Sequence, residues 1–290
     1  MAASTTSVNY RSVGFAVRTS INVLASIFAI IICAVANSQD FREPQDVSFR
    51  AHVDDSDQRY VVSLPKTFND DTPHDLLIAL HGHGSDRWQF VTAKRPECQA
   101  ARDIAFTRNM IFVSPDYRAK TSWMGPAAEG DLLQVLDELK QRFRIRHVVI
   151  SGGSMGGTSA LAFAAMHPER VDGVVSLNGT ANMLEYSNFL DAIAESYGGT
   201  KTEKPDLYRE RSAELFPDRF TMPLAATTGG KDTLIPPDST LRLVAQLKKQ
   251  GSPVISIHRP DGGHETNYAD TISAFEFVLN QLAAKHNTKN

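Results

Sequence analysis

Cysteine and excess charge are both scarce in this sequence. Only Cys33 and Cys98 occur among 290 residues, and 30 lysines and arginines nearly balance 33 acidic residues. No basic run and no basic stripe with interleaved aromatics is present, which argues against a nucleic-acid-binding protein. No cluster of histidine, cysteine or carboxylate residues has the spacing of metal ligands. No internal repeat or low-complexity linker divides the chain, so one domain is expected.

The N-terminus has the pattern of a secretory signal peptide. Arg11 and Arg18 precede an apolar run over residues 21–36, and the run ends in the small-residue triplet Ala34-Val35-Ala36. These features predict a signal peptide over residues 1–36, a mature domain over 37–290, and a secreted or periplasmic protein. The mature chain would keep only Cys98 and would depend on its hydrophobic core rather than on a disulfide.

Two other interpretations of this N-terminal run stay open. An uncleaved run would anchor the protein to a membrane, although a spanning helix needs about 20 apolar residues and this run is shorter. Cys33 could carry a lipid, but Ile32 stands where lipoprotein signals have a small residue. If the segment is cleaved, no stable membrane contact is expected.

Short β-rich runs alternate with longer helical patterns along the rest of the chain. This alternation predicts an α/β fold with a mostly parallel sheet and helices on both faces. Gln58–Leu64 alternates apolar and polar residues, as an early antiparallel strand would. The expected central strands are Leu76–Leu80, Met110–Val113, His147–Ser151, Val171–Leu177, Leu224–Thr228 and Val254–His258. The expected helices are Asp131–Phe143, Thr158–Met166, Ser239–Gln250 and Asn267–Ala284.

A long polar excursion over residues 178–222 separates two of these strands. Helical patterns occur near Met183–Ser196 and Tyr208–Leu215. A connection of more than about 15 residues inside a compact domain is usually a lid or a binding element. The excursion is therefore a candidate cap over a site, and a plain surface insertion is the alternative.

The segment Gly152–Gly156 matches the G-x-S-x-G pattern, with Ser154 at its centre. The pattern follows a β-branched strand and opens a small-residue helix, which is the context that a nucleophile elbow requires. The flanking glycines permit the sharp strand-to-helix turn that exposes the serine hydroxyl. No Gly-Lys-Ser/Thr follows, and no G-x-G-x-x-G can be aligned here, so a phosphate-binding loop is excluded. Ser154 is the candidate nucleophile.

A second glycine-containing loop, His81-Gly82-His83-Gly84, follows the strand Leu76–Leu80. Serine hydrolases with a nucleophile elbow build half of their oxyanion hole at this place. The expected donors are the backbone N–H groups of Met155 and His83, or that of Gly84 if the loop is shifted. An ordinary glycine turn is the alternative interpretation.

The acid of the triad should follow a strand downstream of the serine. Asp232 follows Leu224–Thr228 through Gly229-Gly230-Lys231. Asp238 competes with it, but Asp238 is placed to cap the helix that follows. Asp232 is therefore the candidate acid.

Nine histidines compete for the role of the base, and a lone histidine is by default structural. His264 differs from the others because it lies in the flexible loop Asp261–Glu265, directly after the last strand. The resulting order Ser154, Asp232, His264 is the order that this kind of hydrolase uses. In that arrangement His264 moves the proton, Asp232 orients the imidazole, and an acyl-enzyme forms on Ser154 without any metal or organic cofactor.

From about Asp75 to its C-terminus the chain resembles the α/β-hydrolase superfamily. The matching segments are His81-Gly82-x-Gly84, Ser114–Arg118, Gly153–Gly157, Gly230–Asp232 and Gly263-His264. Within the superfamily the chain is similar to compact secreted esterases, such as the feruloyl and acetylxylan esterases. It is also similar to the catalytic domain of the prolyl-oligopeptidase-like (S9) group. The resemblance implies an α/β-hydrolase fold with a small helical cap.

The leading functional hypothesis is a secreted carboxylic-ester hydrolase, whose partner would be a small-molecule or carbohydrate-linked acyl ester. An S9-like peptidase or aminopeptidase is the second hypothesis, and a non-catalytic binding protein on the same scaffold is the third. Residues that could border the substrate pocket, by their position after the relevant strands, are Gly84, Trp88, Arg118, Trp123 and Met124. For Trp88 and Trp123 a role as core filler is the alternative.

Overall fold

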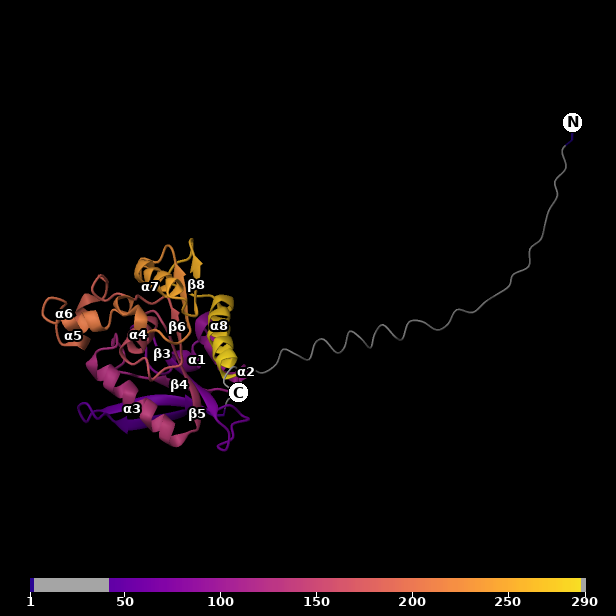
Figure 1. Ribbon diagram of the computed structural model, residues 1–290. Helices are drawn as coiled ribbons and strands as arrows, with labels where there is room; N and C mark the ends of the chain where they lie inside the picture. The colour runs from indigo at the N-terminus through magenta and orange to yellow at the C-terminus, as the bar shows by residue number, and fades with distance from the viewer. Residues whose placement is uncertain (3–41, 288–290) are drawn as a thin grey trace. The chain divides into compact units, whose positions relative to one another are not determined.

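A single eight-stranded sheet forms the centre of the protein in the computed structural model, which describes residues 1–2 and 42–287. The strand order is β1-β2-β4-β3-β5-β6-β7-β8. Figure 1 shows the sheet extending from the indigo and purple strands at the bottom of the view to β8 at the top. The first two strands pair antiparallel, β2 pairs antiparallel with β4, and the remaining neighbours are parallel. The strands are β1 Gln45–Arg50, β2 Asp57–Ser63, β3 His74–Leu80, β4 Ile111–Pro115, β5 Ile145–Gly153, β6 Gly173–Leu177, β7 Leu224–Gly229 and β8 Val254–Arg259.

The central strands are apolar on both faces because helices cover the sheet on both sides. Along β3, Leu76 and Ile78 belong to one buried cluster, whereas Leu77 and Ala79 belong to another. This division follows from the two-residue period of a strand, which sends successive side chains to opposite faces. Two apolar layers therefore hold the sheet in place.

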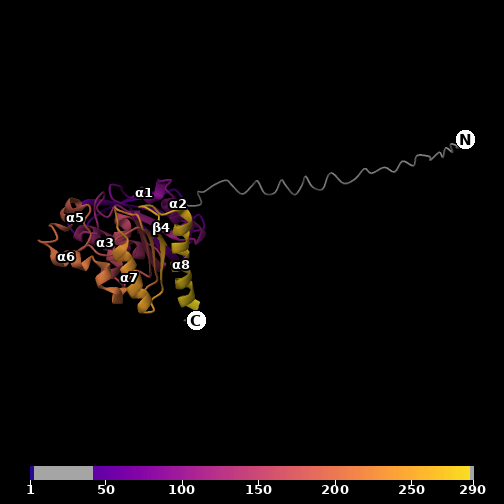
Figure 2. The ribbon, with the colours of Figure 1, turned by 90° about the horizontal axis from the view of Figure 1, so that it is seen from above.

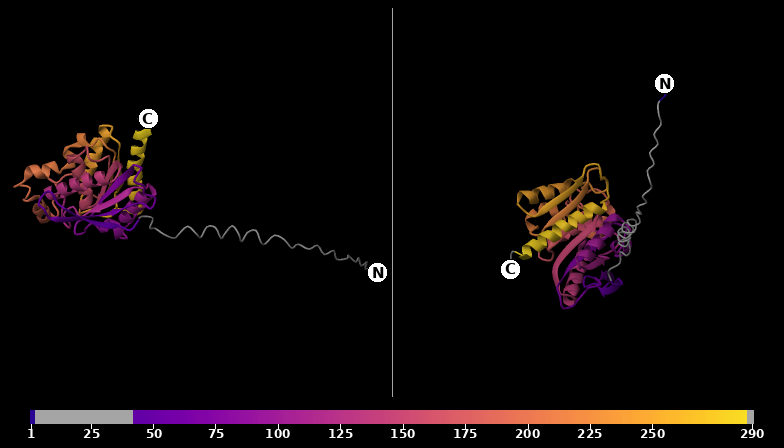
Figure 3. Two further views of the ribbon diagram at one scale, coloured as in Figure 1. Left: turned by 90° about the horizontal axis from the view of Figure 1, so that it is seen from below. Right: turned by 90° about the vertical axis from the view of Figure 1, so that its right-hand side faces the viewer.

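The helices divide between the two faces (Figure 2). On one face lie α1 Gln89–Thr92, α2 Pro96–Thr107 and α8 Tyr268–Asn287, and Figure 3 shows α8 lying across the sheet. The other face carries α3 Pro126–Arg142, α4 Met155–Met166 and α7 Asp238–Lys249. The α/β-hydrolase fold expected from the sequence is confirmed.

Several elements differ from the sequence-based expectation. β1, α1 and α2 were not predicted, and α3 begins at Pro126 rather than at Asp131. Proline suits the first helical position because its missing N–H has no partner there in any case. In the excursion the helices are shorter than expected: α5 spans Leu190–Tyr197 and α6 spans Pro205–Glu210.

The predicted signal-peptide core and its cleavage site lie outside the described residues. Among the helices that the structure does describe, none is both long and apolar enough to cross a membrane.

Candidate active site

Ser154 lies at the sharp turn between β5 and α4, with φ 58° and ψ −118°. A positive φ is costly for a residue that carries a side chain, and such strain is typical of functional positions. The turn is possible because the neighbouring glycines allow close backbone contact. A Cβ added at Gly156 would lie 2.0 Å from the carbonyl oxygen of Leu80, and one at Gly152 would lie 2.4 Å from the carbonyl carbon of Gly156. The elbow predicted from the sequence therefore has a steric reason for both glycines.

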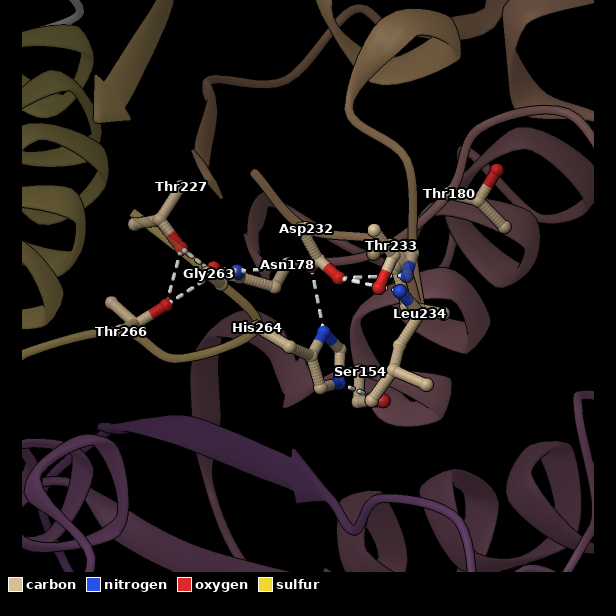
Figure 4. A network of polar contacts seen from close by, with 12 residues as sticks. Ser154, Asn178, Thr180, Thr227, Asp232, Thr233, Leu234, Gly263, His264 and Thr266 are labelled. Atoms are coloured by element: carbon tan, nitrogen blue, oxygen red, sulfur yellow. Dashed lines mark hydrogen bonds and ion pairs between the residues drawn. The ribbon is translucent and has the colours of Figure 1, made fainter. Parts of the chain in front are cut away.

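The structure brings Ser154, His264 and Asp232 together from the carboxyl ends of β5, β8 and β7 (Figure 4). Nε2 of His264 lies 2.8 Å from Oγ of Ser154, and Nδ1 lies 2.7 Å from Oδ2 of Asp232. The Asp232 carboxylate can only accept, so Nδ1–H of His264 donates to it and the imidazole presents its Nε2 lone pair to the serine hydroxyl. The arrangement is that of a nucleophile, a base and an orienting acid.

The carboxylate of Asp232 is fixed from both of its oxygens. Oδ1 accepts the backbone N–H groups of Leu234 at 3.0 Å and Ile235 at 2.9 Å, and the side chain is 1% exposed. The competitor Asp238 is instead an exposed residue in the first turn of α7. The sequence suggested that Asp238 caps this helix, but its side chain makes no capping hydrogen bond and Pro237 occupies the cap position.

In the loop after β3, the N–H groups on either side of His83 have hydrogen-bond partners. Gly82 N–H donates to the side chain of Gln89 at 2.7 Å, and Gly84 N–H donates to the carbonyl of Lys120 at 2.9 Å. Within the described part of the chain no hydrogen bond is recorded for the N–H of His83. The N–H of Met155 lies at the first position of α4, where no intrahelical acceptor exists. Of the two registers considered for this loop, the structure therefore favours the one that uses His83.

The ring of His83 is held in one orientation by an aromatic cluster. Nε1–H of Trp123 donates to Nδ1 of His83 at 3.1 Å. The ring centroids of Phe189 and His83 lie 4.4 Å apart. Burial lowers the pKa of His83 and so favours the neutral ring, whose Nδ1 can accept the hydrogen bond from the indole N–H. The side chain thus braces the loop whose backbone faces the serine.

A cleft of about 210 Å³ opens directly above Ser154. Its wall combines polar groups of the triad with apolar side chains from separate elements. The apolar members include Phe90, Leu177, Phe189 and Leu234. Arg95 and Glu97 form an ion pair at 2.6 Å and supply a polar part of the wall. The cleft is smaller than the sites of about 300–1,000 Å³ that hold drug-sized ligands, so it suits a small substituent.

The pocket residues expected from the sequence are not the ones that line this cleft. Gly84, Trp88, Arg118 and Trp123 are absent from its wall. Trp123 is fully buried and acts through His83, and Arg118 forms ion pairs with Asp54 and Asp131. These positions were inferred from distance along the chain to a strand end, which does not determine where a loop side chain points.

Part of the excursion over residues 178–222 borders the cleft. Phe189 lines the cleft, and two neighbouring side chains attach this stretch to the loop that carries the acid. Tyr186 donates its hydroxyl to the carbonyl of Leu234 at 2.9 Å, and Asn188 donates to the same carbonyl at 2.9 Å. The excursion therefore contributes a wall of the site.

The residues at the site that the sequence analysis missed include Gln89, Asn178 and Phe189. Asn178 directly follows β6, and residues at the carboxyl ends of parallel strands are frequent ligand contacts, so this position offered a signal. Gln89 and Phe189 lie in a short helix and in a loop, and their roles depend on the tertiary fold. Among the described residues, no group of three or more histidine, cysteine, aspartate or glutamate side chains could hold a metal ion.

Comparison with known families decides which group of hydrolases this is. The model of the prolyl oligopeptidase family matches residues 115–284, which include all three residues of the Ser154–His264–Asp232 chain. The chain belongs to the prolyl oligopeptidase family. It is a serine hydrolase. No curated protein sequence matches it.

Solved structures share the fold at low sequence identity. A puromycin hydrolase superimposes with a TM-score of 0.67 at 19% identity, over 83% of this chain and 39% of that one. An acylaminoacyl peptidase of Pyrococcus horikoshii gives 0.64 at 16%, over 89% and 42%. A ferulic acid esterase gives 0.64 at 20%, over 82% and 97%. This member of the prolyl oligopeptidase family thus spans less than half of the puromycin hydrolase and of the acylaminoacyl peptidase, but nearly all of the ferulic acid esterase.

Proposed function

We propose that this protein hydrolyses small carboxylic esters through an acyl-enzyme on Ser154. The observation that supports the proposal most strongly is the continuous series of hydrogen bonds from Ser154 through His264 to Asp232. Near it, the backbone N–H groups of His83 and Met155 have no hydrogen-bond partner among the described residues. In this proposal Ser154 is the nucleophile, His264 the general base and acid, and Asp232 the residue that orients the imidazole.

The first half of the reaction forms the acyl-enzyme. Nε2 of His264 takes the hydroxyl proton as Oγ of Ser154 attacks the ester carbonyl carbon. The negative charge that develops on the carbonyl oxygen is stabilised by the N–H groups of His83 and Met155, and the dipole of α4 adds to this effect. The imidazolium then gives its proton to the leaving alkoxide, and the alcohol departs.

The second half releases the acid by the same route. Water gives a proton to His264 and attacks the acyl carbon, and the imidazolium returns that proton to Ser154 as the bond to the enzyme breaks. No step in this scheme uses a group from outside the chain other than water and the ester.

The cleft supports an ester with a small acyl group and a polar remainder. Phe189 and Leu234 offer an apolar wall for the acyl group, while Arg95 and Glu97 offer donors and acceptors side by side. A hydroxyl group both donates and accepts, so an acyl group attached to carbohydrate suits this wall. A ferulic acid esterase matches this fold over 97% of its own length, which is consistent with the proposal.

A peptidase is the second candidate, and membership in the prolyl oligopeptidase family favours it. The puromycin hydrolase and the acylaminoacyl peptidase are more than twice as long as the part matched here, so their activity does not transfer with the fold. Amides are harder to cleave than esters, because the leaving amine must be protonated as the bond breaks.

Three substrates separate these candidates when the purified domain is assayed: p-nitrophenyl acetate, a carbohydrate acetate and an aminoacyl p-nitroanilide. We expect ester turnover well above amide turnover, and loss of nearly all of it in Ser154→Ala. Residual catalysis of about 10³–10⁴-fold over water would remain in that variant. The control is Ser252→Ala, which removes a hydroxyl before β8, at the end of the sheet away from the site. Efficient amide turnover without ester preference would favour the peptidase.

We further propose that residues 1–36 direct export and are removed, which would make the mature enzyme secreted or periplasmic. The support is the basic flank, apolar run and Ala34-Val35-Ala36 triplet of the sequence. N-terminal sequencing of protein recovered outside the cytoplasm tests it. A start near Asn37 is the expected result, whereas an intact N-terminus in the membrane fraction would show an anchor.

A further inference from the structure

Asn178 is the first residue after β6, and the backbone around it connects three strand ends. The N–H of Ser154 donates to the carbonyl of Leu177 at 2.8 Å, and the N–H of Asn178 donates to the carbonyl of Thr227 at 3.0 Å. Asn178 has φ +50° and is 5% exposed. Asparagine tolerates this left-handed conformation better than most residues with a side chain. The position therefore combines a buried amide with a backbone shape that few residues adopt.

The amide of Asn178 contacts the acid of the triad and the backbone next to its base. Nδ2 donates to Oδ2 of Asp232 at 3.4 Å and to the carbonyl of Gly263 at 3.2 Å (Figure 4). Oδ2 is the oxygen of Asp232 that also accepts from His264. Gly263 directly precedes His264 in the chain. One NH₂ group thus holds the acid and the backbone of the base.

The carbonyl of Gly263 fixes which way this amide points, and two threonine hydroxyls hold its other end. Oδ1 of Asn178 accepts from Oγ1 of Thr227 at 3.0 Å and from Oγ1 of Thr266, and the two hydroxyls lie 2.7 Å apart. The carbonyl of Gly263 can only accept, so the atom that faces it must be the NH₂ group. All three side chains are buried, where a misdirected amide would leave polar groups unsatisfied. The orientation is therefore set by the neighbours.

We propose that Asn178 is a positioning residue for the hydrolysis, acting through Asp232 and His264, and that Thr227 and Thr266 hold its Oδ1 in place. The inference rests on the proposed function of the triad. A second donor on Oδ2 restricts where that oxygen can lie, and the bond to Gly263 restricts the loop that carries the imidazole. Both restrictions keep Nε2 within reach of the serine hydroxyl, and such preorganisation raises kcat more than it changes KM.

Asn178→Gly is the direct test, because glycine accepts the left-handed backbone and only the amide is lost. The measurements are kcat and KM for p-nitrophenyl acetate and the low-field proton resonance of Nδ1 of His264. We expect kcat to fall about 10- to 100-fold, with KM nearly constant and the low-field resonance shifted or broadened. A purely structural amide would change the melting temperature but leave kcat per folded molecule and this resonance as they are, and that result would overturn the proposal.

Thr266 provides a second pair of variants if Asn178→Gly folds poorly. Thr266→Val keeps the shape of the side chain and removes the hydroxyl that holds Oδ1, so kcat should fall. Thr266→Ser restores the hydroxyl and should recover most of the turnover lost in Thr266→Val. Equal turnover in both Thr266 variants would contradict the proposed role of Thr266.

Ser154→Ala, measured alongside, separates this inference from the proposed function. If Ser154→Ala is inactive while Asn178→Gly keeps wild-type kcat, only the role of Asn178 is wrong. If Ser154→Ala keeps its turnover, the proposed function itself fails.

Discussion

Gln89 accepts the backbone N–H of Gly82 on its side-chain oxygen at 2.7 Å, seven residues along the chain. This bond sets the shape of the loop in which the N–H of His83 is left free for the substrate. A Cβ added at Gly82 would lie 3.8 Å from Cβ of Ser154, so the loop runs directly beside the nucleophile. The proposed oxyanion donor, the N–H of His83, is therefore positioned by a side chain from α1 as well as by the loop itself.

Replacing Gln89 should therefore lower turnover without changing the triad. In Gln89→Leu the N–H of Gly82 loses its acceptor, and we expect kcat to fall about 10-fold with little change in KM. Gln99→Leu, the same change at an exposed glutamine of α2, is the control. Ester kinetics on both variants check the prediction, which would be wrong if Gln89→Leu and the wild type turned over equally.

Phe189 should set the size of the acyl group that the enzyme accepts. Its ring lines the cleft and contacts His83, so Phe189→Ala removes a wall without touching the triad. We expect the ratio of kcat/KM for a benzoyl ester to that for an acetyl ester to rise by about 10-fold. Leu190→Ala, which alters the exposed neighbour outside the cleft, is the control. An unchanged ratio in Phe189→Ala would place the acyl group elsewhere.

The positions of the triad residues could be predicted because each one follows a recognisable strand. Ser154, Asp232 and His264 come after three apolar runs, and parallel strands deliver their carboxyl ends to one edge of the sheet. The order of these runs along the chain was therefore enough to expect that they meet. Which of His83 and Gly84 offers its N–H could not be decided, since it depends on an acceptor at Lys120 that is distant in sequence.

The pocket wall could not be predicted, because it depends on side-chain direction within irregular loops. Trp123 has φ +42° and points into the core, where it donates to His83 instead of facing substrate. Phe189 has φ +54° in the excursion that sequence patterns assigned to a helix. No periodic pattern encodes such left-handed positions, so the contacts of both aromatic rings emerge only from the packed structure.

Cys98 should be chemically inert in the folded enzyme. It is fully buried in α2, and burial raises the pKa of its thiol to about 12. The thiolate is the reactive form, and almost none exists at pH 8 at such a value. At pH 8 a chromogenic disulfide that reacts with thiols should react slowly with native protein over residues 37–290. In urea it should react rapidly, with the one thiol of Cys98. Fast labelling of the native protein would show that α2 opens readily.

Glu129 should make stability depend on pH in the acid range. Burial alone would raise the pKa of Glu129, but the hydrogen bond from His167 and the charge of Arg211 outweigh it and hold the pKa below the usual 4.5. A lowered folded-state pKa stabilises the fold above the unfolded-state value, and this contribution is lost as pH falls through the folded-state value.

Urea unfolding of Glu129→Gln at several pH values measures this contribution. At pH 7 the variant should be less stable than the wild type by about 1–3 kcal/mol, and the difference should shrink below pH 4.5. Glu169→Gln, which alters a carboxylate that is 67% exposed beside the same histidine, should change stability little. A difference that is constant down to pH 3 would show that the charge of Glu129 is not responsible.

The most direct test of the central claim is to map the adduct that a fluorophosphonate probe forms with the folded mature protein. A serine activated by His264 attacks phosphorus, whereas an ordinary serine hydroxyl does not. Peptide mass spectrometry should find one adduct, on Ser154, and labelling should be absent in Ser154→Ala and much slower in His264→Ala. Native protein that is left unlabelled, or labelled at a different serine, would contradict the account.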